Sequence, residues 1–75
     1  MIFERLRAII CDQLAVDEDE IALYSNMYED LYTDSLDMVD ISMKIEDEFG
    51  VWIPDDVLLT ISTVGELVEY IEDNL

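Results

Sequence analysis

The segment that decides the fold reads DSLDMVDISMKIEDEFG and spans residues 34–50. Its apolar residues are too widely spread for the strict alternation of a β-strand, but they fit a helix with a broad buried face. They are Leu36, Met38, Val39, Ile41, Ile45 and Phe49. Gly50 suits the position just beyond a helix end, where the backbone turns left-handed. The pattern therefore predicts a helix from Ser35 to Phe49.

Three further helices are predicted around this segment. One runs from Ile2 to about Leu14, where apolar residues recur at helical spacing. A short helix covers roughly Asp55 to Leu59 and follows a proline, which is tolerated at the first helical position. The last helix opens at Thr63, which has capping-box spacing to Glu66, and runs nearly to the end of the chain. The expected fold class is all-α, a small four-helix bundle of three main helices and one short one.

A long loop separates the first helix from the helix at Ser35. Its apolar residues keep no sustained period, so we expect only a helical turn near Asp17 to Ile21. The acidic run within that turn could attract divalent cations loosely, but it lacks the glycine and the distant glutamate of an EF-hand, so no metal site is predicted. Long loops in compact domains are often functional.

Composition limits what the chain can do. With 75 residues it forms one domain, and a chain of this size buries only about 60% of its unfolded surface, which leaves no room for a deep enzyme cleft. An apolar fraction of 52% argues against disorder. The net charge of −17 makes nucleic acid and anionic membranes poor partners and favours a basic protein surface. We expect a monomer.

The cell compartment is predicted from three absences. Cys11 is the only cysteine, so no intrachain disulfide can form, and it is expected to be buried as a small hydrophobe. The N-terminal residues lack the features of a signal peptide, and no apolar run approaches membrane-spanning length. A cytoplasmic protein is expected.

Ser35 stands where the loop becomes a helix. A serine there is common as an N-cap, but Asp34 can take that role, which leaves the Ser35 hydroxyl free to face solvent. A phosphate on Ser35 would lie beside the unpaired N–H groups at the helix start, a favourable place for an anion. The chain has no histidine and Lys44 is far down the helix, so a nucleophilic serine is not supported. Ser35 is thus an attachment point, and the protein is not an enzyme.

Acidic residues return to one side of the same helix at helical spacing. They are Asp37, Asp40, Glu46, Asp47 and Glu48. We interpret them as a surface for docking a partner, the alternative being an ordinary solvated face. Lys44 interrupts them and is expected to pair with Asp40 and Glu48 at four-residue spacing.

These motifs together resemble a known family. They are Leu31 to Asp37 around Asp-Ser-Leu, the acidic helix ending in Glu46 to Gly50, Ile53-Pro54-Asp55, and Thr63-Val64 opening the last helix. The chain resembles the acyl carrier proteins of type II fatty-acid or polyketide synthesis. The resemblance implies that Ser35 bears 4′-phosphopantetheine, transferred from coenzyme A by a phosphopantetheinyl transferase. The thiol of that arm would hold acyl groups as thioesters for fatty-acid or polyketide synthesis enzymes.

The resemblance also implies roles for other residues. The positions that would meet basic patches on partner enzymes are Asp34, Asp37, Asp40, Glu46 and Asp47. The candidate lining of a pocket that shelters the acyl chain is Tyr28, Leu36, Val39, Ile45, Ile61 and Val68. Plain core packing is the alternative for each lining residue.

Some residues depart from the family pattern. Tyr32 stands where carriers usually have glycine, and Trp52, Leu58 and Leu59 could form an exposed apolar patch in a region that is often more polar. These departures leave room for a dedicated carrier in a secondary pathway beside a housekeeping role in fatty-acid synthesis. A D-alanyl or peptidyl carrier, or an unmodified acidic protein that mimics nucleic acid, remain as alternatives.

Overall fold

The computed structural model describes all residues from 1 to 75 and contains helices without a β-sheet. The elements are α1 (Ile2–Leu14), a 3-10 turn η1 (Glu18–Glu20), α2 (Ser35–Phe49), α3 (Asp55–Leu58) and α4 (Val64–Asp73). This confirms the predicted all-α bundle of three main helices and one short one. In detail, α3 begins at Asp55 as expected, with Pro54 as its N-cap, and ends one residue earlier than expected.

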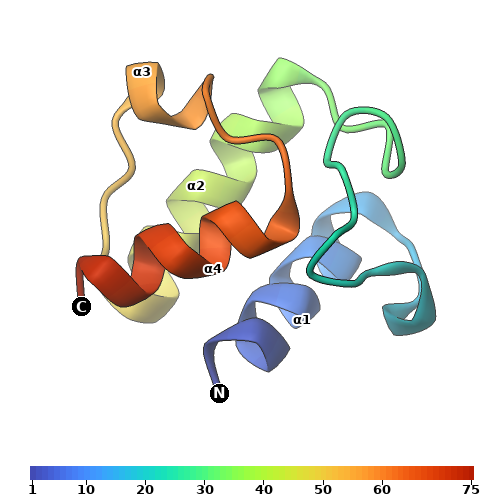
Figure 1. The fold of residues 1–75 in the computed structure, drawn as a ribbon, viewed down its shortest axis with the longest axis horizontal. Coiled ribbons are helices and arrows are strands. Elements are labelled where there is room, and N and C mark those ends of the chain that lie inside the picture. Colours follow the sequence, from blue (N-terminus) through green and yellow to red (C-terminus); the bar gives the residue numbers. More distant parts are fainter.

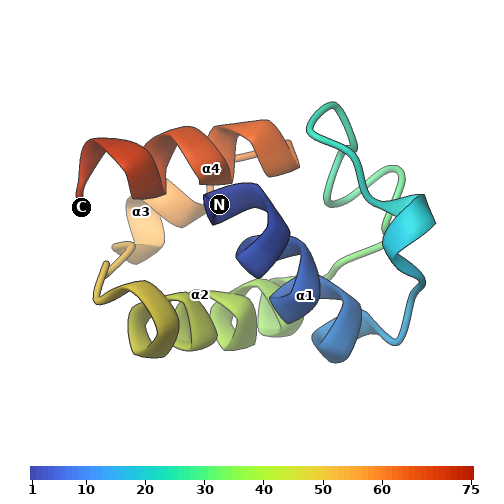
Figure 2. The ribbon, with the colours of Figure 1, turned by 90° about the horizontal axis from the view of Figure 1, so that it is seen from below.

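The arrangement is simplest to follow in Figure 2, where α1 lies between α2 and α4 and packs against both. The long loop lies on one side of the bundle and α3 on the other (Figures 1 and 2). Both termini lie far from the start of α2 (Figure 1). The residues around Ser35 therefore occupy an end of the molecule that neither chain terminus approaches.

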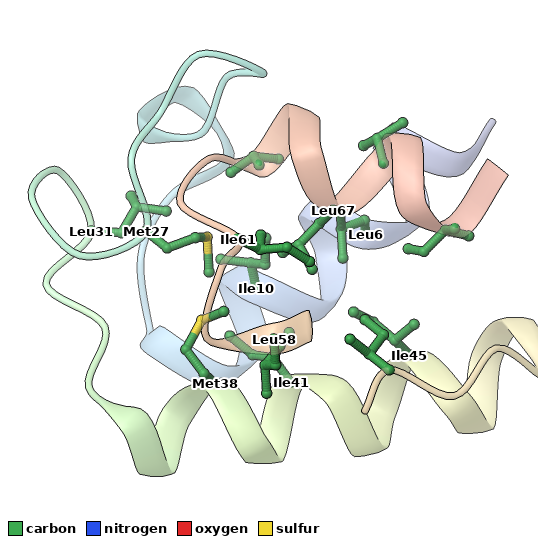
Figure 3. Packing of buried hydrophobic residues seen from close by; sticks show 14 of the residues in the cluster. Leu6, Ile10, Met27, Leu31, Met38, Ile41, Ile45, Leu58, Ile61 and Leu67 are labelled. Atoms are coloured by element: carbon green, nitrogen blue, oxygen red, sulfur yellow. The ribbon is translucent and has the colours of Figure 1, made fainter. Parts of the chain in front are cut away.

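One hydrophobic cluster of 16 buried residues holds these elements together. From α2, the side chains of Met38, Ile41 and Ile45 point toward Leu6 and Ile10 of α1 (Figure 3). The three α2 residues follow helical spacing, so one face of α2 covers the core. Burial of these apolar side chains, each contributing about 1.5–3 kcal/mol, is the main stabilising term.

The long loop is fastened to the start of α4 by backbone hydrogen bonds. The amide of Met27 donates to the carbonyl of Ser62 at 2.7 Å, and that of Val64 donates to Ser25 at 3.0 Å. A third bond, at 2.8 Å, runs from the amide of Gly65 to the carbonyl oxygen of Leu23. A Cβ atom on residue 65 would stand 3.0 Å from that same oxygen. Glycine is needed here so that the loop can approach the helix closely.

We expect Gly65→Val to reduce the free energy of unfolding by about 2 kcal/mol, because the added side chain must push the Leu23 carbonyl away from its hydrogen bond. Urea denaturation monitored by circular dichroism measures this loss. Glu69→Val, at an exposed position of the same helix, is the matched control and should change stability by less than about 0.5 kcal/mol. Equal losses in the two variants would show that the contact is unimportant.

All three basic residues make ion pairs that involve α1. Arg5 pairs with Glu48 at 2.6 Å, Lys44 with Asp12 at 3.5 Å, and Arg7 with Glu18 at 3.8 Å. The prediction that Lys44 pairs within α2 was wrong, because α1 packs along that side of α2 and supplies Asp12 as the partner. These pairs are partly exposed and contribute little to stability. They do, however, occupy every cationic side chain of the molecule.

Cys11 is half-buried and packs against the edge of the core, where full burial was expected. Desolvation by burial, and secondarily the carboxylate of Glu18, raise the pKa of the Cys11 thiol. Arg7 acts in the opposite direction but does not outweigh them. The thiolate is thus disfavoured in the folded chain, which agrees with a packing role for this residue.

We expect alkylation of Cys11 by iodoacetamide to be several-fold slower near neutral pH in the native chain than in urea, and to accelerate at a higher pH. The sign for stability follows from the raised folded pKa. The thiol contributes stability that is complete below the unfolded pKa of about 8.5 and is lost as the pH rises through the folded value. Identical rate profiles with and without urea would contradict the raised pKa.

Candidate functional site

Ser35 is the first residue of α2, and Asp34 caps the helix as predicted. The Asp34 carboxylate accepts from the amide of Asp37 at 2.8 Å, and the Asp37 carboxylate accepts a long bond of 3.5 Å from the amide of Asp34. Because this reciprocal pair satisfies the helix start, Ser35 is not needed there. Its side chain is exposed and its hydroxyl makes no hydrogen bond within the chain. A group attached to Ser35 Oγ would therefore disrupt no hydrogen bond of the fold.

A cavity of about 210 Å³ opens beside Ser35 between α2 and α3. Its lining is mostly apolar and consists of Tyr28, Ser35, Met38, Val39, Asp55, Leu58 and Leu59. Met38 and Leu58 are buried and form its floor, while Val39 and Leu59 stay exposed at its rim. The wall next to the serine is therefore apolar and the opening faces solvent.

The structure places the predicted lining residues in three environments. Tyr28 and Val39 line the cavity beside Ser35. Ile45, Ile61 and Val68 are buried in the core, and Leu36 is exposed on the outside of α2. Sequence reasoning missed Met38, Leu58, Leu59 and Asp55 as lining residues. Met38 could have been found, because the third residue after Ser35 on a helix lies on the same side.

The other cavity does not adjoin Ser35. It is a shallow groove of about 430 Å³ between α1 and α2, lined by Arg5, Ala8, Ile9, Asp12, Lys44 and Glu48. Its charged side chains already pair with one another across the groove. We therefore assign the functional site to the smaller cavity, where the free hydroxyl lies.

The outward side of α2 combines acids with exposed apolar residues. Leu36, Val39 and Met43 lie at helical spacing and form an exposed stripe, 74%, 41% and 56% accessible. Leu36 and Val39 were predicted to be buried, and this was wrong because the face of α2 that turns to the core carries Met38, Ile41 and Ile45 instead. We call Leu36, Val39, Asp40, Met43 and Asp47 the outer face of α2.

The five predicted docking acids are not equally free. Asp34 and Asp37 hold the helix cap, and Gln13 of α1 donates to Asp37 at 3.4 Å and to Asp40 at 3.3 Å. The carboxylates of Glu46 and Asp47 are exposed and have no partner within the chain. These two acids can bind a basic partner without disturbing the fold.

The expected apolar patch near α3 is smaller than predicted. Leu58 is buried and belongs to the cavity floor, because α3 turns it toward α2. Trp52 and Leu59 are exposed. Trp52 lies between the buried residues Val51 and Ile53, so the alternation of this extended segment directs it outward.

Comparison with known proteins agrees with this geometry. Residues 4–71 match the family model described as the phosphopantetheine attachment site. An acyl carrier protein of Clostridium acetobutylicum is 43% identical over 96% of this chain and 94% of its own length. One of Thermotoga maritima is 46% identical over 99% of this chain and 91% of its own. A solved structure assigned to the acyl carrier proteins of Mycobacterium tuberculosis superposes with a TM-score of 0.90 at 27% identity, covering 97% of each chain.

The chain belongs to the acyl carrier proteins, carriers that have a phosphopantetheine attachment site. It is a non-catalytic carrier whose cofactor is the covalent phosphopantetheine arm. Membership implies two kinds of partner, a phosphopantetheinyl transferase and synthase enzymes that use the loaded arm. Family membership therefore rules out the alternative of an unmodified acidic protein that mimics nucleic acid. The length and hydropathy of the helices do not allow any of them to span a bilayer.

Proposed function

We propose that Ser35 is the residue that bears the 4′-phosphopantetheine arm of a single carrier domain formed by residues 1–75. The observation that carries this assignment is the exposed Ser35 hydroxyl, left free by the Asp34 cap. Ser25 and Ser42 are buried and hydrogen-bonded, and Ser62 is half-buried. Ser35 is thus the only exposed serine of the chain.

Helix electrostatics also supports Ser35 as the attachment residue. The unpaired amides and the positive end of the α2 dipole lie at the first turn, where a phosphodiester on Ser35 would sit. When bound, the arm supplies a thiol that carries acyl groups as thioesters. The protein's own contribution is to hold the phosphate end rigidly and to keep the hydroxyl side open to the enzyme that modifies it.

The attachment residue can be located directly by mass spectrometry. Incubation with coenzyme A and a broad-specificity phosphopantetheinyl transferase should add one phosphopantetheine to the intact chain. Tryptic cleavage after Arg7 and Lys44 then gives one peptide, residues 8–44, that holds Ser25, Ser35 and Ser42. Fragmentation of this peptide should place the added mass on Ser35. Mass on another serine, or no gain at all, would overturn the assignment.

We further propose that the cavity beside Ser35 shelters the first part of the acyl chain. Its volume of about 210 Å³ exceeds the roughly 150 Å³ that is known to hold a benzene molecule in an apolar protein interior. Met38 forms the floor, and methionine is a flexible residue that can move to admit more chain. The predicted contacts Tyr28 and Val39 are kept, and Met38 and Leu58 replace Ile45, Ile61 and Val68.

Methyl NMR tests this proposal without changing the protein. In a chain labelled at the methionine methyl groups, conversion from the unacylated arm to the octanoyl thioester should shift the Met38 signal. Met43 is on the same helix but on its outer face, so its signal should stay in place and acts as the control. If Met38 is unmoved while the mass confirms loading, the chain is not held in this cavity.

The remaining part of the proposal concerns partners. We propose that the outer face of α2, together with Asp34, Asp37 and Glu46, docks on basic patches of fatty-acid or polyketide synthesis enzymes. Weak docking suffices, because the tethered thioester reaches the docked active site at high effective concentration. A monomeric state and a cytoplasmic location belong to the same proposal. With a net charge of −17, nucleic acid and membrane insertion are not part of it.

A further inference from the structure

Tyr32 has an unusual backbone. Its φ angle is +56°, in the left-handed region, where a bulky L-residue is disfavoured and glycine is not. Ala15 is the only other non-glycine residue with a positive φ, and it lies at the C-terminal end of α1, where this conformation is common. No helix end explains the conformation of Tyr32. A tyrosine at this position therefore makes the fold less stable than a glycine would.

The side chain of Tyr32 does not compensate for this strain within the fold. It is 84% exposed, and its phenol makes no hydrogen bond in the chain. Its neighbours are fixed, since Leu31 and Thr33 are buried and the amide of Thr33 donates to the carbonyl of Met27 at 2.9 Å. The ring is thus held outward on a rigid support. Strain without an internal benefit points to a use outside the chain.

The position of Tyr32 identifies the partner. It stands three residues before Ser35, and an enzyme that forms a bond to Ser35 Oγ must cover the surface around that atom. An enzyme that acts at the far end of the arm can dock on α2 alone, and its chemistry does not require contact with the loop before Ser35. The exposed acids Asp30 and Asp34 flank the ring in the sequence. An aromatic side chain two residues from each of two acids suits a guanidinium group, which stacks on the ring and pairs with a carboxylate oxygen that the amides of Asn26 and Asp37 leave free.

We propose that Tyr32 is a recognition residue for the phosphopantetheinyl transferase and contacts an arginine-bearing surface of that enzyme. This rests on the proposed modification of Ser35. Tyr32 positions the carrier on the enzyme and takes no part in the chemistry. At this position the backbone conformation lowers the stability of the fold, while the exposed ring adds contact area beside Ser35.

The test measures two properties in the same variants, the melting temperature of the carrier and kcat/KM for its modification. Tyr32→Gly should raise the melting temperature by about 4 °C or more, as should Ala15→Gly. Only Tyr32→Gly should lower kcat/KM, by about tenfold and mainly through a higher KM. Tyr32→Phe should keep most of the rate, because the ring remains. Tyr24→Ser, which removes another highly exposed tyrosine of the loop, should leave the rate unchanged.

Tyr32→Asn separates contact from flexibility, since asparagine tolerates a positive φ without the mobility of glycine. It should lose as much kcat/KM as Tyr32→Gly. A wild-type rate in Tyr32→Gly, or a rate lost in glycine but restored in asparagine, would overturn the proposal. Failure of the Ser35 assignment looks different, because the wild-type carrier would then gain no mass or gain it elsewhere.

Discussion

Ser35→Ala is expected to abolish modification, so that the variant keeps its original mass after incubation with coenzyme A and transferase while the wild-type chain gains one phosphopantetheine. The reason is that no other serine of the chain is exposed. The fold should be unaffected, because Asp34 and Asp37 hold the helix start and alanine is a good helix former. We expect a change in unfolding free energy of less than about 0.5 kcal/mol.

Two controls make this result decisive. Ser62→Ala removes a half-buried serine and should be modified at the wild-type rate. Circular dichroism and urea denaturation of Ser35→Ala establish that the variant is folded when it is tested. A full mass gain in a folded Ser35→Ala chain would mean that the arm is attached elsewhere.

The second large effect is expected from charge reversal at the far part of α2. Glu46→Lys combined with Asp47→Lys should lower kcat/KM with a basic partner enzyme by about 10 to 100-fold at low salt, because steering and docking both depend on these charges. The two carboxylates have no partner within the chain, so their reversal disturbs no internal contact. The deficit should shrink as salt is raised and exposed charges are screened.

Net charge alone could slow the encounter, so the control must change it equally. Glu69→Lys combined with Glu72→Lys alters two exposed acids of α4 and gives the same net charge. This control should lose much less activity, since α1 lies between α4 and α2 (Figure 2). Equal losses in the two double variants would assign the effect to overall charge and reject docking through α2.

Much of the fold could be predicted because its signals are local. The helix at Ser35 follows from apolar spacing and from Gly50, whose φ of +71° confirms the expected left-handed end. Thr63 forms the capping box with Glu66 as its spacing predicted. Hydrophobic periodicity and capping act within a few residues, so one sequence suffices to recognise them.

The features that could not be predicted from the sequence depend on residues that are distant in the chain. The spacing of Leu36 and Val39 makes them apolar members of α2, but only the position of α1 decides which side of the helix is covered. The partner of Lys44 was misjudged for the same reason. The positive φ of Tyr32 could not be predicted from the residue itself, because a tyrosine normally adopts a negative φ. Only the tertiary contacts of the loop impose the left-handed conformation.

The separation of both termini from the start of α2 has a practical consequence (Figure 1). A tag, a fluorescent fusion or a surface tether joined to either end would leave the Ser35 side of the molecule open. Carriers immobilised in this way would all present their loading side to the solution. The domain could equally be inserted into a longer polypeptide, with flexible segments on both sides, and still meet a visiting enzyme.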